Sequence, residues 1–283
     1  LLPLERIFPL EVHWSRKSES VTRILQAWNV GADSVVFVDD SAMEIADVKR
    51  THSEIECFQF PKDNPAAVYT LLWKLRDLFG KSAIREEDTL RLETIRRAAS
   101  SLAFKPGDPP ESADGFLEQA KAELTLNFRT DPLDPRALEL VNKTNQFNLN
   151  GRRYTEAGWR DYLRSPEAFL LIAAYQDKYG PLGKIAVIAG RKQTEILQVD
   201  VWVMSCRAFS RRIEHRCLEC LFKTFGVKEI AFDLAATPKN GPLRDFLRFY
   251  LDGNAGGGAR ISRDLFVPNC PPLFHKVKEI DRG

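Results

Sequence analysis

The stretch from Ile196 to Gly226 constrains the fold more than any other part of this chain. Residues 196–203 alternate apolar and polar side chains and are rich in β-branched types, which predicts a β-strand. Beyond Ser210 the apolar residues recur every four positions, as on the buried face of a helix, at Ile213, Cys217, Leu221 and Phe225. Gly226 follows where a helix C-cap glycine belongs. The sequence therefore predicts a strand, a tight turn and a helix.

The turn between this strand and this helix carries one thiol and three guanidinium groups, on Cys206, Arg207, Arg211 and Arg212. Free backbone N–H groups and positive charge at a helix N-terminus suit a phosphate or pyrophosphate. A solvated basic turn is the simpler interpretation, but a thiol at the end of a strand favours a functional site. The Cys206 thiolate is favoured beside Arg207, so Cys206 is the candidate nucleophile, with a small buried core residue as the alternative.

Length and composition limit the classes of protein that this chain can belong to. With 283 residues it exceeds the usual size of one domain, so we expect two. An apolar content of 44% and a charged content of 28% are those of an ordinary soluble protein. No apolar run is long enough to span a bilayer, so no membrane partner is expected. The net charge of +2 argues neither for nor against nucleic acid, and we expect none as a partner.

The chain has 5 cysteines, an odd number without a regular framework, which suits a reducing compartment and a cytoplasmic protein. Cys217 and Cys220 have CxxC spacing but are predicted to lie in mid-helix, so a structural zinc site is not expected. Cys57 stands in an apolar strand and is expected in the core, whereas Cys270 is the second candidate for a reactive thiol. His215 is expected on a solvated helix face rather than beside the thiol.

Helices in the first part of the sequence carry recognisable start signals. A helix is expected from Lys17, with Ser18 as its N-cap. Ser41 is a candidate cap for a second helix over residues 42–50.

Strands alternate with these helices. The apolar run 34–40 predicts a strand that is buried on both faces of a parallel sheet, and residues 55–60 predict the next strand. This order predicts an open α/β sheet, whose ligands lie at the carboxyl ends of the strands, where Asp39 and Asp40 stand.

The remaining sequence predicts a linker and a second α/β domain. A helix is expected over 66–79 and a charged linker helix over 84–104, interrupted at 105–110 by three prolines. Further strands are expected over 124–129, 167–175, 182–190 and 227–234, and further helices over 116–124, 134–145, 156–163 and 241–251, with one or two strands in the tail. The predicted domains are residues 1–82 and 123–283, joined by linker helices over 83–122.

Several long motifs resemble a known family. They are His13–Glu19, Phe37–Asp40, Leu138–Asn150, Arg152–Thr155, Asp177–Gly183 and Trp202–Arg207. Together they are similar to the FkbH-like proteins, which join a haloacid-dehalogenase (HAD) domain to a GNAT-like acyltransferase domain. The resemblance covers nearly the whole chain. It implies an α/β protein in which a partial HAD-type, Rossmann-like parallel sheet precedes a GNAT-like mixed α/β domain.

In the GNAT fold, the turn after the fourth strand carries an R/Q-x-x-G-x-G/A phosphate loop for coenzyme A. Here that register falls on Arg207–Arg212, where Ser210 and Arg212 replace both glycines. This departure argues against ordinary binding of coenzyme A.

The resemblance implies handling of a glyceryl unit. In such proteins, 1,3-bisphosphoglycerate supplies a phosphoglyceryl group to an enzyme cysteine, and HAD chemistry removes the phosphate. The glyceryl thioester then passes to the phosphopantetheine thiol of an acyl carrier protein, in secondary-metabolite or surface-glycan biosynthesis. Cys206 is the expected acyl-carrying thiol, and Arg207, Arg211 and Arg212 are expected to recognise the small phosphorylated donor.

The resemblance also assigns roles in the first domain. Lys17 matches the HAD lysine, and Asp39 and Asp40 match the acidic pair that binds Mg²⁺. A helix N-cap region is the alternative for this pair. The family's aspartate nucleophile lies upstream of Lys17, so we expect no phosphatase turnover from this chain, through truncation or natural loss.

A polar patch after the first helix of the second domain is expected to bind a polar acyl group; its members are Asn142, Lys143, Thr144, Asn145, Gln146 and Asn148. Lys239 and Asn240 resemble the pair that opens the last GNAT helix, near the expected path of an acyl or pantetheine chain. Capping and loop hydrogen bonds are the alternative for the patch.

Three functions are compatible with these features. The first is an acyltransferase that loads a small hydroxyacyl group onto a carrier protein. The second is a non-catalytic module that binds a carrier protein or pantetheine. The third is an N-acetyltransferase that depends on acetyl-coenzyme A, which the replaced glycines disfavour.

Overall fold

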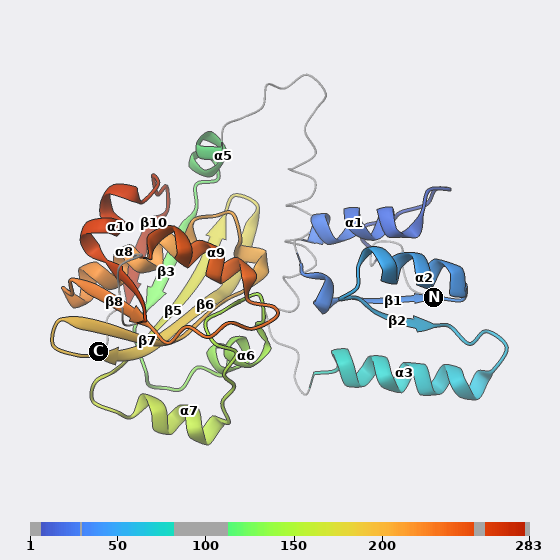
Figure 1. Cartoon of the computed structure of the whole chain (residues 1–283), viewed down its shortest axis with the longest axis horizontal. Helices are drawn as coiled ribbons and strands as arrows, with labels where there is room; N and C mark the ends of the chain where they lie inside the picture. Colours follow the sequence, from blue (N-terminus) through green and yellow to red (C-terminus); the bar gives the residue numbers. More distant parts are fainter. Residues whose placement is uncertain (1–6, 29, 82–112, 252–257, 281–283) are drawn as a thin grey trace. The chain divides into compact units, whose positions relative to one another are not determined.

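A computed structural model describes residues 7–28, 30–81, 113–251 and 258–280. The chain divides into two compact units, Leu1–Ala103 and Phe104–Gly283 (Figure 1). Unit 1 contains a parallel strand pair and unit 2 a mixed sheet, so the predicted α/β class is confirmed. The predicted linker helix over 84–104 and its interruption at 105–110 lie outside the described residues.

Unit 1 is built on two short parallel strands, β1 (Val36–Asp39) and β2 (Glu56–Gln59). Its other elements are α1 (Lys17–Trp28), the 3₁₀ turn η2 (Ala32–Ser34), α2 (Ala42–Thr51) and α3 (Pro65–Phe79). Helices and strands therefore alternate as predicted. Ser41 caps α2, because its hydroxyl oxygen accepts a hydrogen bond from the backbone N–H of Glu44.

Two details of unit 1 differ from the prediction. Ser18 lies inside α1 rather than at its N-cap, and the Asp47 carboxylate on α2 accepts the Ser18 backbone N–H at 3.3 Å. The Asp47 carboxylate, from another helix, thus satisfies a free amide in the first turn of α1, where the sequence pattern had predicted a cap by Ser18. Strand β1 is only half-buried, with Val38 36% exposed, because among the described residues of unit 1 it pairs with β2 alone.

Unit 2 is organised around an eight-stranded sheet in the order β10-β3-β5-β6-β7-β8-β9, with β4 paired to β7. The strands are β3 (Glu123–Asn127), β4 (Phe147–Asn148), β5 (Ala168–Asp177), β6 (Gly180–Lys192), β7 (Ile196–Met204), β8 (Glu229–Phe232), β9 (Ala259–Ser262) and β10 (Lys276–Ile280). Strands β3, β5, β6 and β7 pair in antiparallel fashion, whereas β8 lies parallel to β7 and β10 parallel to β3.

Helices cover both faces of this sheet (Figure 1). One face packs on α6 (Pro135–Lys143) and α7 (Glu156–Leu163), and the other on α8 (Ile213–Phe225), α9 (Gly241–Tyr250) and α10 (Arg263–Asn269). The short helix α5 (Ala113–Gln119) precedes β3. Val141 and Trp159 are fully buried in the first layer, and Leu221 and Leu247 in the second. The apolar faces of the helices therefore pack on both sides of the sheet and form two hydrophobic cores.

The predicted strand, turn and helix over 196–226 are confirmed, with one shift. The turn contains a 3₁₀ segment, η3 (Cys206–Ala208), and Gly226 ends α8 in the left-handed conformation with φ of 62°. Helix α8 begins at Ile213 rather than at Ser210, because Ser210 and Arg212 have φ of 63° and 57°, which no right-handed helix permits.

Candidate functional site

Cys206 lies at the carboxyl end of β7, as the sequence predicted. The strand ends at Met204, and the Ser205 backbone N–H donates to the Ile185 carbonyl on β6 at 2.8 Å. Cys206 then begins η3, and its carbonyl accepts the Phe209 N–H at 3.0 Å. The Cys206 residue is partly exposed, whereas Cys217 and Cys220 on α8 are buried. The sheet thus places one thiol at the start of the turn.

The backbone of the turn is left-handed at two positions that lack glycine, Ser210 and Arg212. A left-handed conformation costs an L-residue roughly 1–2 kcal/mol, so it persists only where the surroundings enforce it. These are the two positions at which the GNAT-type loop has glycine. The turn therefore keeps a glycine-like backbone path with other side chains.

The first amides of α8 follow this turn. Among the described residues, no hydrogen-bond acceptor faces the backbone N–H groups of Ile213, Glu214 and His215, and the first helical bond of this type runs from Arg216 to Arg212 at 3.2 Å. The N-terminus of a helix carries partial positive charge. An anionic group near Cys206 is compatible with this arrangement.

The arginine side chains of the turn are bound to the chain itself. Arg211 donates to the carbonyls of Arg207 and Phe209 at 2.9 and 3.2 Å, and Arg212 donates to the Pro272 carbonyl at 2.8 Å. Arg212 also pairs with the Asp114 carboxylate. Arg207 is buried. In this structure the guanidinium groups fix the turn, and their predicted recognition of a phosphorylated donor stays a prediction.

His215 differs from its prediction. Its ring packs edge-on against Phe246 and Tyr250 of α9, with centroids 5.0 and 5.7 Å apart, and its side chain is only 15% exposed. It does not lie on a solvated helix face, because α9 covers this part of α8. The four-residue apolar period of α8 gave no sign of this second contact surface.

Strands β7 and β8 form a fork. They pair only from Ile196 with Glu229 to Val199 with Phe232. Beyond that point β4 takes the place of β8 at the edge of β7, where Phe147 pairs with Met204 and Asn148 with Val203. We call residues 147–150 the fork segment, because they lie between β7 and the chain that leaves β8.

Hydrogen bonds hold the fork segment on both sides. The Leu149 N–H donates to the Trp202 carbonyl at 2.9 Å, and the Ala235 N–H donates to the Leu149 carbonyl at 3.2 Å. The Asn150 side-chain amide donates to the carbonyls of Asp200 and Asp233 at 2.9 and 3.0 Å. The fork is therefore closed by the chain's own residues.

Asn240 supports the same segment. It is fully buried, and its side-chain amide donates to the carbonyls of Asn148 and Ala235 at 3.0 and 2.9 Å. Its side-chain oxygen accepts the Thr237 N–H at 2.9 Å. The neighbouring Lys239 is exposed. In this structure Asn240 therefore binds backbone groups, and its place beside an acyl path stays a prediction.

Residues of the polar patch make hydrogen bonds and an ion pair with other parts of the chain. Asn142 exchanges two hydrogen bonds with the Tyr154 backbone, at 2.8 and 2.9 Å, and Asn148 donates to the Thr144 carbonyl at 2.9 Å. Asn145 accepts from Arg153 at 2.7 Å, and Lys143 pairs with Glu139 at 3.3 Å. Gln146 is partly buried. These contacts are those expected of loop and cap residues, and binding of an acyl group by the patch stays a prediction.

In unit 1 the acidic pair stands at the carboxyl end of β1, as predicted. The Asp39 carboxylate accepts the Ser41 N–H at 2.9 Å, and Asp40 pairs with Lys62 at 3.3 Å. Lys17 is the first residue of α1 and is exposed. Within the described parts of the chain, no group of three or more His, Cys, Asp or Glu residues is arranged to hold a metal ion.

The remaining thiols are chemically distinct from a reactive cysteine. Burial raises the pKa of Cys57 and, far more strongly, that of Cys217. Burial also raises the pKa of Cys220 and of Cys270 to about 11. Thiols with raised pKa values are poor nucleophiles at neutral pH. Cys57 packs against the small core of unit 1, as predicted.

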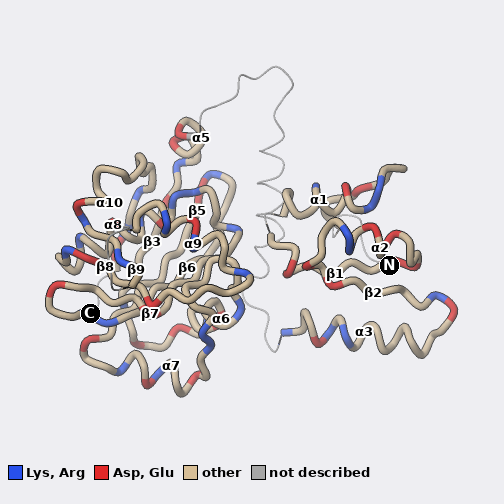
Figure 2. Tube along the Cα trace, in the orientation of Figure 1, with Lys and Arg blue, Asp and Glu red and all other residues tan. Residues whose placement is uncertain are grey.

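Two features of the surface bear on possible partners. Lys and Arg residues are interspersed with Asp and Glu along both units (Figure 2). Within the described residues, no helix combines the length and the apolar character that crossing a membrane requires.

Comparison with known proteins gives weak likenesses only. No known protein family matches the chain, and no curated protein matches it. A domain from Methanocaldococcus jannaschii is similar in structure with a TM-score of 0.38 and 10% identity, over 50% of this chain and 99% of that one. A GCN5-related glucosamine N-acetyltransferase region of a fungal multi-domain GH3 β-N-acetylglucosaminidase has a TM-score of 0.31 and 11% identity, over 78% of this chain and 33% of that one. We draw nothing on function from either likeness.

Proposed function

We propose that the chain carries an acyl group on Cys206 and passes it to the phosphopantetheine thiol of an acyl carrier protein. The observation that carries this proposal is the turn after β7, where the partly exposed residue Cys206 precedes two left-handed residues, Ser210 and Arg212. Both are positions at which the phosphate loop of the resembled GNAT fold has glycine, and this coincidence supports the proposal. Strained conformations of this kind cluster at sites where the backbone has a role.

The chemistry follows from the thiol. The Cys206 thiolate attacks the carbonyl carbon of an acyl phosphate, a C–S bond forms, the C–O bond to the phosphate breaks, and phosphate leaves with the electron pair. The free amides of Ile213, Glu214 and His215 favour a departing anion. The carrier thiolate then attacks the thioester and releases the Cys206 thiolate. With 1,3-bisphosphoglycerate as donor, the group loaded is phosphoglyceryl.

A supporting role for unit 1 is part of the same proposal. Asp39 and Asp40 offer carboxylate oxygens at a strand end, which is the type of ligand that Mg²⁺ prefers. Two carboxylates supply only part of a near-octahedral shell, so the proposal requires further oxygen ligands, as in a HAD-type site. Mg²⁺ bound there would neutralise phosphate charge, and Lys17 would add a positive charge beside it.

A second candidate function is favoured by the closed fork. An extended carrier arm gains hydrogen bonds by adding to a free strand edge, but the fork segment occupies the edge of β7 at Trp202–Met204. The arginines of the turn are also bound to the chain itself. Both observations favour a module that binds a carrier protein at its surface and receives no acyl group. They disfavour an ordinary acetyl-coenzyme A-dependent N-acetyltransferase.

Intact-mass measurement separates the two candidates. After incubation with 1,3-bisphosphoglycerate, we expect the wild-type chain to gain the mass of one phosphoglyceryl group and the Cys206→Ala variant to gain none. The matched control is Cys270→Ala, which removes the second candidate thiol and keeps the adduct. An unmodified wild-type chain would overturn the acyltransferase and favour the binding module. An adduct on the Cys206→Ala variant would show that a residue other than Cys206 carries the acyl group.

A further inference from the structure

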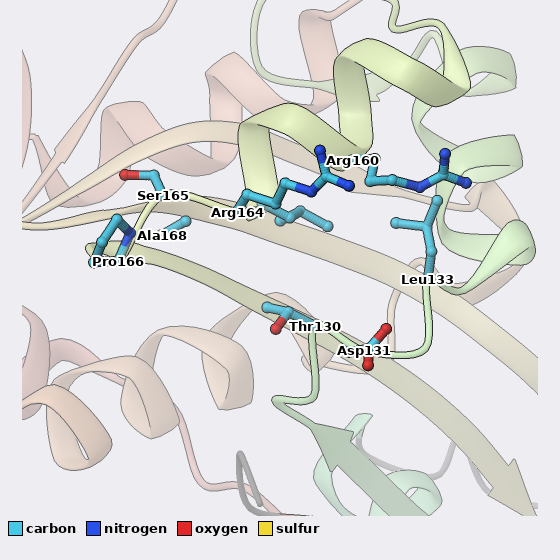
Figure 3. Close-up of a pocket in the computed structure, with 9 residues that line it drawn as sticks. Thr130, Asp131, Leu133, Arg160, Arg164, Ser165, Pro166 and Ala168 are labelled. Atoms are coloured by element: carbon cyan, nitrogen blue, oxygen red, sulfur yellow. The ribbon is translucent and has the colours of Figure 1, made fainter.

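A cleft of about 540 Å³ lies in unit 2 between α7 and the loop that joins β3 to α6 (Figure 3). A volume in this range suits a small molecule. Four apolar residues line the cleft, namely Leu133, Leu163, Pro166 and Ala168. None of the residues that line it belongs to the Cys206 turn or to the fork segment.

The charged side chains of the cleft have opposite signs on its two walls. Arg160 extends from α7 and Arg164 from the C-cap position that follows it, and Thr130 and Asp131 face them from the β3–α6 loop (Figure 3). No ion pair within 4.0 Å joins Asp131 to any residue that the structure describes, and no hydrogen bond to its carboxylate is found there. Opposite charges therefore face each other across a gap.

Each of the two arginine side chains makes an exposed ion pair with another residue. Arg160 pairs with Glu156 at 2.7 Å and Arg164 with Asp161 at 3.1 Å, and the side chains of both pairs are exposed. Exposed ion pairs of this kind contribute only about 0–1 kcal/mol, so a ligand competes with them easily. Guanidinium groups one helical turn apart suit a carboxylate.

We propose that this cleft binds a free α-amino acid with an apolar side chain. The ligand's carboxylate pairs with Arg160 and Arg164, its ammonium group pairs with Asp131, and its side chain packs on Leu133 and Leu163. A simple anion, including a phosphorylated acyl donor, leaves the Asp131 carboxylate unpaired and close to a like charge, which disfavours it. The proposal is thus independent of acyl transfer at Cys206.

Titration calorimetry of the full chain with L-leucine tests this site. We expect binding with a Kd of about 1 mM or tighter. Two comparison ligands each lack one charge: 4-methylpentanoate has no ammonium group, and 3-methylbutylamine has no carboxylate. Both are expected to bind at least about tenfold more weakly, because each leaves one wall of the cleft unpaired.

Variants assign the binding to the cleft. Asp131→Asn, and Arg160→Gln combined with Arg164→Gln, should each weaken L-leucine binding at least about tenfold. The matched control is Arg248→Gln, which breaks a similar exposed pair with Asp245 on α9 and should change nothing. Absence of L-leucine binding would overturn the proposal. So would equal binding of 4-methylpentanoate, or unchanged binding by Asp131→Asn.

Discussion

The side-chain amide of Asn150 donates to both the main-chain and the side-chain oxygens of Asp233, at 3.0 and 3.3 Å, although 83 positions separate the two residues. The same amide donates to the Asp200 carbonyl on β7 at 2.9 Å. One side chain thus ties the fork segment to both arms of the fork.

The Asn150→Ala variant tests this tie. We expect it to lower the free energy of unfolding by about 1–3 kcal/mol, because partly buried carbonyls lose their donor. Urea unfolding measures the change. The control is Asn269→Ala, whose exposed amide donates to the Leu265 carbonyl alone, and its effect should be smaller. Equal effects of the two variants would contradict the role given to Asn150.

The Ser210→Gly variant tests the strain in the turn. Ser210 is exposed and has φ of 63°, so glycine removes a steric penalty without removing a buried contact. We expect the free energy of unfolding to rise by about 1 kcal/mol. Ser205→Gly is the control, because Ser205 has an ordinary φ of −61° and glycine there should destabilise. A loss of stability in Ser210→Gly would show that the conformation is not strained.

Local signals in the sequence predicted much of this fold. Gly226 marks the end of α8 and Ser41 caps α2, because each acts through its own backbone or side chain within a few residues. Helix α10 was not predicted, although Ser262 caps it through the Leu265 N–H, because only one or two strands were expected in the tail. Ser18 was misplaced, because its amide is satisfied by Asp47 from a distant part of the sequence.

The candidate site was less predictable for a related reason. Cys206 and the acidic pair were placed at strand ends because periodicity and strand order fix them. The left-handed conformations of Ser210 and Arg212 and the closure of the fork by Asn150 depend on tertiary contacts. The cleft at Asp131 brings together residues of α7 and of a loop that lie far apart in the sequence, so no local pattern predicted it.

His275 should make stability depend on pH. Burial, together with the positive charge of the nearby Arg216, lowers its pKa from 6.5 to about 4. The unfolded chain therefore binds a proton between these pH values while the folded chain does not, so stability is full above pH 6.5 and falls as the pH drops towards 4. Between pH 7.5 and 5.0, we expect His275 to account for a loss of up to about 2 kcal/mol.

Urea unfolding of the wild-type chain and of His275→Gln at both pH values isolates this contribution. Other groups titrate equally in the two proteins, so the difference between their pH dependences belongs to His275. The variant should lose less stability on acidification. Identical losses would mean that the folded and unfolded chains bind this proton equally.

Cys206 should be the first thiol to react with iodoacetamide. It is partly exposed, whereas burial raises the pKa of Cys57, Cys217, Cys220 and Cys270. Peptide mapping after brief alkylation at neutral pH should find the label mainly on residue 206. If Cys206 reacts only after unfolding, it is a core residue and the binding module gains support.

Locating the acyl group tests the central claim most directly. The full chain is incubated with 1,3-bisphosphoglycerate, digested, and analysed by tandem mass spectrometry with and without hydroxylamine, which cleaves thioesters. We predict a phosphoglyceryl group on Cys206 that hydroxylamine removes. A group found on Cys270 or another residue, or no group on any peptide, would contradict acyl transfer through Cys206.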